Sequence, residues 1–223
     1  MTGKPIQRRI AQTNYDRLSR WYDGLAGGSE DRARDLGIDL LKVQPADRVL
    51  EIGSGTGKGL LALATVGGTA HGIDISTGML SVAHSRLSAS GVMDRVLMSQ
   101  ADALRLPYHD ASFDALFMCF ALELFSKEDI LVVLGECIRV LRRGGRICIV
   151  CMALPSRLNM ITRLYLLAHR LLPAVVDCHP IQLPVVMATA GFVTLAVRVL
   201  SLWGLSVQVA LGNNEELTGL RDL

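Results

Sequence analysis

Several features that would place this chain in other protein classes are scarce or missing. The 23 Lys and Arg residues nearly balance the 21 Asp and Glu residues, and a net charge of +2 gives no electrostatic reason to expect nucleic acid as a partner. There are only five cysteines, and this odd number at irregular spacings indicates free thiols in a reducing compartment. No group of His, Cys and Asp residues has the spacing of metal ligands, so no metal is predicted.

Long apolar runs are missing too, although half of the residues are hydrophobic and the mean hydropathy is +0.36. The longest charge-free stretch, residues 178–197, is interrupted by two prolines, a histidine, a glutamine and a glycine. A membrane-spanning helix needs ~20 predominantly apolar residues. The N-terminal segment has no apolar core of the kind found in signal peptides. We therefore expect a cytoplasmic protein.

Short apolar segments alternate with amphipathic ones, which is typical of a parallel sheet with helices on both faces. Strands are expected at residues 48–52, 69–75, 95–100, 113–120 and 146–152, and helices at 60–66, 76–90, 127–141, 155–172 and 183–190. Residues 193–201 and 206–211 predict a terminal hairpin. This order predicts an α/β fold with a doubly wound, Rossmann-like sheet, mostly parallel, and an antiparallel hairpin at its C-terminal edge.

One CxxC pattern, Cys148 and Cys151, superficially matches a metal or redox motif. Both cysteines fall within an expected strand, where an offset of three points them to opposite faces. We therefore interpret them as core residues, which buried free cysteines usually are.

A glycine-rich loop follows the first expected strand, in the sequence VLEIGSGTG at residues 49–57. Glycines let the chain turn sharply and bring its backbone against a ligand. A phosphate-binding P-loop would need GxxxxGK followed by Ser or Thr, but Ile52 stands in place of its first glycine and Gly59 follows Lys58. A dinucleotide fingerprint would need glycine or alanine at position 58, where this chain has lysine.

Two aspartates follow the next expected strands. Asp74 ends the second strand, 23 residues after Glu51, where nucleotide-binding sheets carry an acid that binds ribose hydroxyls. Asp102 follows the third strand in the segment QADAL. Because ligands of doubly wound sheets bind beyond the carboxyl ends of the strands, we expect both acids to line one crevice with the glycine loop. A solvated acid after a strand is the simpler alternative for Asp74.

Taken in order, these segments resemble a known family. The loop has the spacing GxGxG with Glu51 two residues before its first glycine, as in motif I of the class I methyltransferases that use S-adenosylmethionine (SAM). The run LPYHDASFD at 106–114 is a frequent companion in that family, and LRRGGR at 141–146 matches its L-R/K-P-G-G turn with Arg143 in place of proline. Residues from about 40 to 152 are therefore similar to the ubiquinone and menaquinone biosynthesis C-methyltransferases (methyltransferase type 11).

This resemblance implies a single class I methyltransferase domain with SAM as cofactor and S-adenosylhomocysteine as product. A helical cover is expected at 1–40, the SAM-binding core at 41–152, and acceptor-side helices with the hairpin at 153–223. A tyrosine near the N-terminus would close over SAM. The alternative is that this tyrosine only packs against an amphipathic N-terminal helix and stabilises it. The predicted cofactor-binding residues are Tyr15, Tyr22, Glu51, Gly53, Ser54, Gly55, Thr56, Gly57, Asp74, Ile75, Met79, Asp102, Ala103, Leu104 and Phe120.

Methyl transfer from SAM needs a general base only if the acceptor loses a proton during attack. Glu123 follows the fourth strand among apolar neighbours, which would raise the pKa of its carboxyl group and suit a base. His179 lies where the family builds its acceptor pocket, and Asp177 could tune its imidazole. These two are the predicted catalytic residues, and His109 ranks behind them. Glu123 could equally order its loop, and His179 could lie at the surface beside Pro180.

The acceptor leaves only a compositional trace. Residues 156–172 form an apolar segment with Arg163 and Arg170 one heptad apart, typical of a helix on a membrane, of a lid over a hydrophobic pocket, or of core packing. The lid interpretation predicts a small, lipophilic acceptor: a quinone precursor, a lipid or a natural-product intermediate. Two other functions stay open. One is an NAD(P)-dependent reductase on the same fold, which Lys58 and the lack of a Tyr-x-x-x-Lys pair disfavour; the other is a catalytically inactive methyltransferase-like subunit.

Overall fold

The computed structural model of the chain describes residues 29–154, 180–202 and 204–215. Its helices are α3 (Ser29–Leu41), α4 (Lys58–Val66), α5 (Thr77–Ala89), α6 (Lys127–Val140) and α8 (Leu183–Ala190), with 3₁₀ turns η1 (Met93–Arg95) and η2 (Leu122–Leu124). Its strands are β1 (Arg48–Ile52), β2 (Thr69–Asp74), β3 (Val96–Gln100), β4 (Phe113–Cys119), β5 (Leu141–Met152), β6 (Val193–Leu202) and β7 (Leu205–Asn213). Within these ranges no helix is long and apolar enough to cross a membrane.

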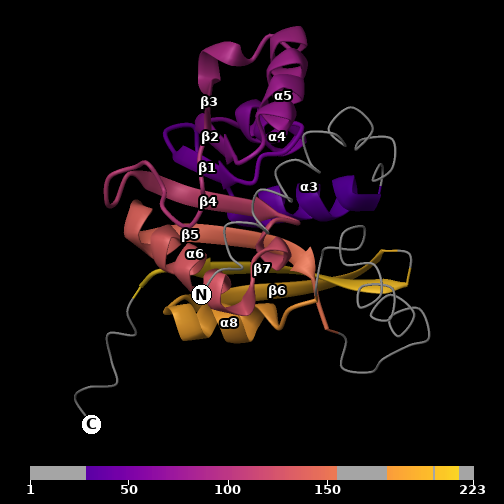
Figure 1. Cartoon of the computed structure of the whole chain (residues 1–223), viewed down its shortest axis with the longest axis vertical. Coiled ribbons are helices and arrows are strands. Elements are labelled where there is room, and N and C mark those ends of the chain that lie inside the picture. Colours follow the sequence, from indigo (N-terminus) through magenta and orange to yellow (C-terminus); the bar gives the residue numbers. More distant parts are fainter. Residues whose placement is uncertain (1–28, 155–179, 203, 216–223) are drawn as a thin grey trace, which may run out of the picture.

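The described strands form one sheet in the order β3-β2-β1-β4-β5-β7-β6, which Figure 1 shows from top to bottom. β1 pairs in parallel with β2 and β4, β2 with β3, and β4 with β5, whereas β7 runs antiparallel to both β5 and β6. The predicted doubly wound, mostly parallel sheet is confirmed, and its terminal hairpin inserts β7 between β5 and the edge strand β6. The strand order reverses between β1 and β4, so a ligand is expected beyond their carboxyl ends.

Apolar layers cover both faces of the sheet. On one face α6 and α8 pack over side chains that include Leu50 of β1 and Leu116 of β4. On the other face α3 and α4 pack over side chains that include Val49 and Phe117. Adjacent residues of β1 and β4 therefore enter opposite layers, as the period of two in a strand requires. Burial on both faces explains why these strands are nearly continuous apolar runs in the sequence.

The two cysteines of the CxxC pattern lie in β5. Cys148 belongs to the layer under α3 and α4, and Cys151 belongs to the layer under α6 and α8. Both cysteines are buried. The predicted placement on opposite faces of the sheet is confirmed.

β5 begins earlier than the sequence pattern predicts. Leu141 pairs with Phe113, and the next described pair is Arg146 with Ala115, so an irregularity takes up the extra residues of β5. Gly144, with φ of 70°, lies within it. Basic residues and glycines are locally typical of a turn, but pairing with β4 extends the strand back to the end of α6. The predicted helix at 155–172 lies outside the described residues.

Candidate functional site

The glycine loop joins β1 to α4 at the carboxyl end of the sheet, and its outer glycines are required by close packing. The N–H of Gly53 donates to the carbonyl of Ile73 at 2.9 Å, which ties the loop to the end of β2. Gly53 has φ of 74°, and a Cβ there would lie 2.6 Å from the Cβ of Ala121. Gly57 has φ of 80°, and its Cβ would lie 2.8 Å from that of Ala83. Any larger residue would push the loop away from its neighbours.

The centre of the loop, by contrast, is open. Gly55 has φ of 51°, and no atom of the described residues lies within 4 Å of the position that its Cβ would take. Beside it Ser54 is buried, and its Oγ has no hydrogen-bond partner among the described residues. The loop therefore combines packed flanks with a central backbone that a ligand can approach.

Asp74, at the end of β2, is held by backbone groups on both carboxylate oxygens. Its Oδ1 accepts the N–H of Ser76 and its Oδ2 accepts the N–H of Gly55, each at 2.8 Å. These two bonds orient the charged group at the edge of the glycine loop. A carboxylate so oriented can accept charge-assisted hydrogen bonds from hydroxyl groups of a ligand.

Asp102 lies one strand further along the same edge. β2 and β3 pair with Asp74 opposite Gln100, and the carbonyl of Asp74 accepts the N–H of Ala101 at 3.1 Å. The Oδ1 of Asp102 accepts the N–H of Leu104 at 3.0 Å, an Asx turn that orients this carboxylate. The structure therefore brings the two predicted acids to neighbouring strand ends beside the glycine loop.

Glu51 lies beneath the loop. It is 3% exposed, its carboxylate accepts the N–H of Leu60 in α4, and a Cβ on Gly59 would lie only 1.9 Å from its Oε1. Burial raises the pKa of Glu51 to about 8; the positive charge of Arg34 opposes this shift, and the negative charge of Asp74 adds to it. Its Oε2 has no hydrogen-bond partner in the described part of the chain. Glu51 thus supports the start of α4, and with it the loop.

Other predicted cofactor residues border the loop. Met79 is buried, and its N–H donates to the Oγ of Ser76, the residue that caps α5, at 3.1 Å. Ile75 is half-buried at the end of β2. Phe120 follows β4 with φ of 51°, an uncommon backbone conformation for a residue other than glycine, and its N–H donates to the carbonyl of Val150 at 2.8 Å. This conformation turns the chain from β4 toward Ala121 and so toward the glycine loop.

Sequence analysis missed two basic residues that hold the loop in place. Arg86 of α5 donates a short hydrogen bond to the carbonyl of Thr56. Lys58, directly after the loop, forms an ion pair with Asp31 of α3, with 3.2 Å between Nζ and Oδ1. The partners are 30 and 27 residues apart in the chain, so no local pattern could reveal either contact.

The predicted base Glu123 lies in η2, shortly after the end of β4. It is completely buried, and its Oε1 accepts the N–H of Met152 from β5 at 3.0 Å. Burial raises the pKa of the nearby Cys119 thiol, and the charges of Glu51 and Glu123 add to that shift. The charges of both buried glutamates therefore act on Cys119, the last residue of β4.

Three predicted site residues, Tyr15, Tyr22 and His179, lie outside the described residues. His109 lies in the loop before β4, and its carbonyl accepts the Oγ–H of Ser112 at 2.7 Å. No group of three or more His, Cys, Asp or Glu side chains in the described ranges is placed to hold a metal ion.

The arrangement fits a ligand that carries hydroxyl groups and positive charge. Carboxylates fixed at two strand ends accept hydroxyl and amino donors. Ser54 Oγ and Glu51 Oε2, two buried oxygens that have no partner among the described residues, lie at the same loop, and its centre is open at Gly55. SAM combines ribose hydroxyls, an adenine amino group and a cationic sulfonium, so the residues present fit this cofactor.

Comparison with known proteins agrees. The model of the family described as "Methyltransferase domain" matches residues 49–145. The demethylmenaquinone methyltransferase of Thermus thermophilus is 32% identical over 199 residues, which are 80% of this chain and 87% of that protein. A ubiquinone/menaquinone biosynthesis C-methyltransferase of Ectopseudomonas mendocina is 36% identical over 138 residues, 60% of this chain and 53% of that protein. The chain thus spans most of the first relative and about half of the second.

Solved structures share the fold. A SAM-dependent methyltransferase from Methanosarcina mazei superimposes with a TM-score of 0.69 at 21% identity, over 80% of this chain and 97% of that one. The sheet order, the glycine loop and the identity with a relative over most of its length lead to one conclusion. The chain belongs to the class I SAM-dependent methyltransferases, and it is an enzyme that uses SAM as its cofactor.

Proposed function

We propose that this methyltransferase transfers the methyl group of SAM to a small, lipophilic acceptor, with a quinone precursor as the first candidate. The observation that carries the cofactor part is the pair of acids, Asp74 and Asp102, that backbone N–H groups orient beside the open loop at Gly55. The acceptor part is supported by the names of the two relatives, a demethylmenaquinone methyltransferase and a ubiquinone/menaquinone biosynthesis C-methyltransferase.

Each element of the site has a proposed task. Asp74 accepts the ribose hydroxyls, and Asp102, with Ala103 and Leu104, receives adenine. The backbone of residues 53–57 lies along the methionine part of SAM. Tyr15 or Tyr22 closes over the cofactor, and Glu51 supports the loop from below. Ile75, Met79 and Phe120 complete the walls of the site.

Bound SAM supplies an activated methyl group, so the chain's own part is to orient, bind and exclude water. Holding an acceptor atom in line with the methyl group can lower the activation barrier by up to ~7–11 kcal/mol. Glu123 is the proposed base for an acceptor that must lose a proton, with His179 as the second candidate. The position of Glu123 after β4, on the acceptor side, supports this assignment.

Apolar side chains near the carboxyl ends of β4 and β5 support a lipophilic acceptor. Leu124 follows β4 in η2 and Leu154 follows β5, and both side chains are exposed. An acceptor approaching this side would meet them before it reached the cofactor. Peripheral membrane contact through residues 156–172 belongs to the same proposal.

Calorimetry followed by turnover tests the proposal. SAM and S-adenosylhomocysteine should both bind, and NAD(H) should not. Mass spectrometry should then detect a methyl group on a demethylated naphthoquinol or benzoquinol, with a water-soluble catechol as the polar control. Failure to bind S-adenosylhomocysteine would overturn the cofactor assignment. Binding without transfer to any acceptor would instead indicate an inactive accessory subunit, and preference for catechol would exclude the lipophilic acceptor.

A further inference from the structure

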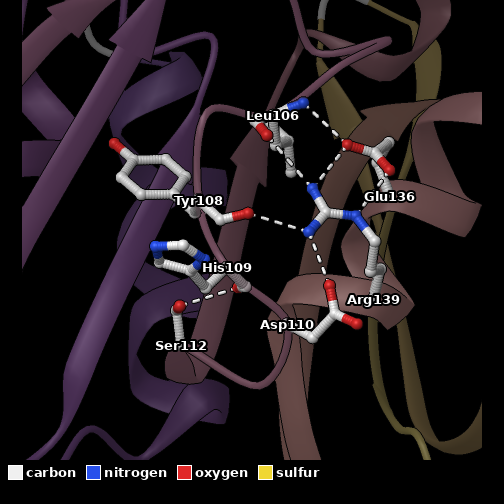
Figure 2. A network of polar contacts seen from close by, with 7 residues as sticks. All are labelled: Leu106, Tyr108, His109, Asp110, Ser112, Glu136 and Arg139. Atoms are coloured by element: carbon white, nitrogen blue, oxygen red, sulfur yellow. Dashed lines mark hydrogen bonds and ion pairs between the residues drawn. The ribbon is translucent and has the colours of Figure 1, made fainter.

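Helix α6 carries a charged pair that holds the loop between β3 and β4, as Figure 2 shows. Nε and Nη2 of Arg139 donate to the two carboxylate oxygens of Glu136, each at 2.8 Å. Nη1 donates to the carbonyl of Tyr108 at 2.8 Å and to Oδ1 of Asp110 at 2.9 Å, and Nη2 donates to the carbonyl of Leu106 at 3.1 Å. These bonds use all five N–H donors of the guanidinium, three of them on one loop.

Further contacts fasten the loop from other sides. Oε2 of Glu136 also accepts the N–H of Leu106 at 2.7 Å. The hydrogen bond from Arg139 is the main cause that lowers the pKa of Glu136, which keeps the pair ionised at neutral pH. The ring of Tyr108 packs edge to face on Phe113 of β4, with 4.8 Å between centroids. The loop is therefore held at its backbone and at its side chains.

The held loop begins with the turn that carries Asp102. Within the turn the N–H of Arg105 donates to the carbonyl of Asp102 at 3.0 Å. On the strand side Ala101 is bonded to the end of β2, and on the other side Leu106 is bonded to Glu136. The turn is thus fixed at both ends, by the sheet at one and by the charged pair of α6 at the other.

We propose that Arg139 is a positioning residue for adenine recognition. Together with Glu136 it fixes the turn at 102–105, so that the carboxylate of Asp102 selects the 6-amino group of adenine. This inference rests on the proposed function, in which Asp102 receives that amino group. A lysine would keep the charge, but its single ammonium cannot span Glu136 and the loop carbonyls at once. The fork shape of the guanidinium is what the loop requires.

A pair of ligands isolates this role. S-adenosylhomocysteine and S-inosylhomocysteine differ only on one edge of the base, where the inosyl ligand has a carbonyl oxygen in place of the 6-amino group and a proton on N1. Calorimetric titration compares their binding to the wild-type enzyme, Arg139→Gln and Arg139→Lys, at a temperature where thermal unfolding shows each to be folded. The matched control is Arg142→Gln, which breaks an ion pair with Asp114 (Nε to Oδ1 2.5 Å) outside this loop.

The wild-type enzyme and Arg142→Gln should prefer S-adenosylhomocysteine by about a hundredfold, because Asp102 would lose a donor and face an oxygen in the inosyl ligand. Both Arg139 variants should retain only about a tenth of that preference. Should Arg139→Gln not fold, Glu136→Gln takes its place.

The outcomes separate this inference from the proposed function. An unchanged preference in the Arg139 variants, even with both ligands bound more weakly, would show that the pair only stabilises the fold and would overturn the inference. Full restoration by lysine would show that charge suffices and would overturn it as well. If the wild-type enzyme binds both ligands equally, Asp102 does not recognise the 6-amino group and this inference is overturned. The assignment of SAM as cofactor would be unaffected by that result. No binding of either ligand would overturn the proposed function itself.

Discussion

The two sides of the site are built in different ways. On the cofactor side the acids are oriented by backbone N–H groups close to them in the chain or in the glycine loop, as Asp74 is by Ser76 and Gly55. On the acceptor side Glu123 is held by the N–H of Met152, 29 residues away on β5. The cofactor side therefore depends on local turns, and the acceptor side depends on how β4 and β5 come together.

The two buried glutamates express the same difference. Glu51 lies on β1 under α4, a helix that begins at Lys58, and a glycine at position 59 makes room for it. Glu123 instead meets a strand that forms much later in the sequence, where its carboxylate accepts the N–H of Met152. Substitutions on the two sides should therefore affect different properties of the enzyme. The following tests are ordered by the size of the expected effect.

The largest effect is expected on the acceptor side. Glu123→Gln keeps an acceptor oxygen for the N–H of Met152 but cannot take up a proton, so kcat should fall about 10²–10⁴-fold. The Kd of S-adenosylhomocysteine should stay the same. Single-turnover methyl transfer and calorimetry measure the two quantities, with Glu128→Gln on α6 as the exposed control. An unchanged kcat would show that Glu123 is not a base and that it only orders its loop.

The second effect concerns pH and the cofactor side. The pKa of Glu51 is raised from 4.5 to about 8 in the folded protein, so the unfolded chain ionises first as pH rises. The contribution of Glu51 to stability should therefore be greatest below pH 4.5, fall between pH 4.5 and 8, and be lowest above pH 8, by as much as roughly 5 kcal/mol. Glu51→Gln should remove this fall and be the more stable protein at pH 9.

Urea unfolding of the wild type and Glu51→Gln at pH 5, 7 and 9 checks this prediction. The two curves should converge at the lowest pH and separate as pH rises. Equal pH dependence in both proteins would mean that Glu51 is ionised at little cost, and the contrast between the two glutamates would be lost.

The third effect concerns ribose binding on the cofactor side. In Asp74→Asn the amide NH₂ must face one of two backbone donors, the N–H of Gly55 or that of Ser76, because each carboxylate oxygen accepts one of them. The Kd of S-adenosylhomocysteine should rise about 10–100-fold. Asp94→Asn, at a site that is 72% exposed, is the control and should bind normally. If Asp74→Asn binds S-adenosylhomocysteine as tightly as the wild type, the ribose does not bind at Asp74.

The smallest effect tests the local fit under the loop. Gly59→Ala would bring a Cβ to 1.9 Å from Oε1 of Glu51 and should lower the free energy of unfolding by about 1–3 kcal/mol. Adding Glu51→Ala should recover most of that loss, because the clashing carboxylate is gone. Gly135→Ala on α6, where a Cβ meets no atom of the described part of the chain within 4 Å, is the matched helical control and should be neutral or stabilising. Additive effects of the two substitutions would contradict the contact.

Much of the fold followed from pattern alone. The strand order along the chain, the helix at 183–190 and the opposite faces of Cys148 and Cys151 are confirmed, because hydrophobic period and glycine position are local properties. The early start of β5 was missed, because Leu141 joins the strand only through its pairing with Phe113.

The sequence by itself determined the parts of the site that the backbone builds: the glycine turns, the acids after β2 and β3, and the capped start of α5. Only the tertiary structure decided the contacts of Lys58 with Asp31, of Glu123 with Met152, and of Arg139 with the loop before β4. A turn is specified by the few residues within it, so it can be inferred from them. A side chain that meets a partner some 30 residues away has its place set by the packing of the whole sheet.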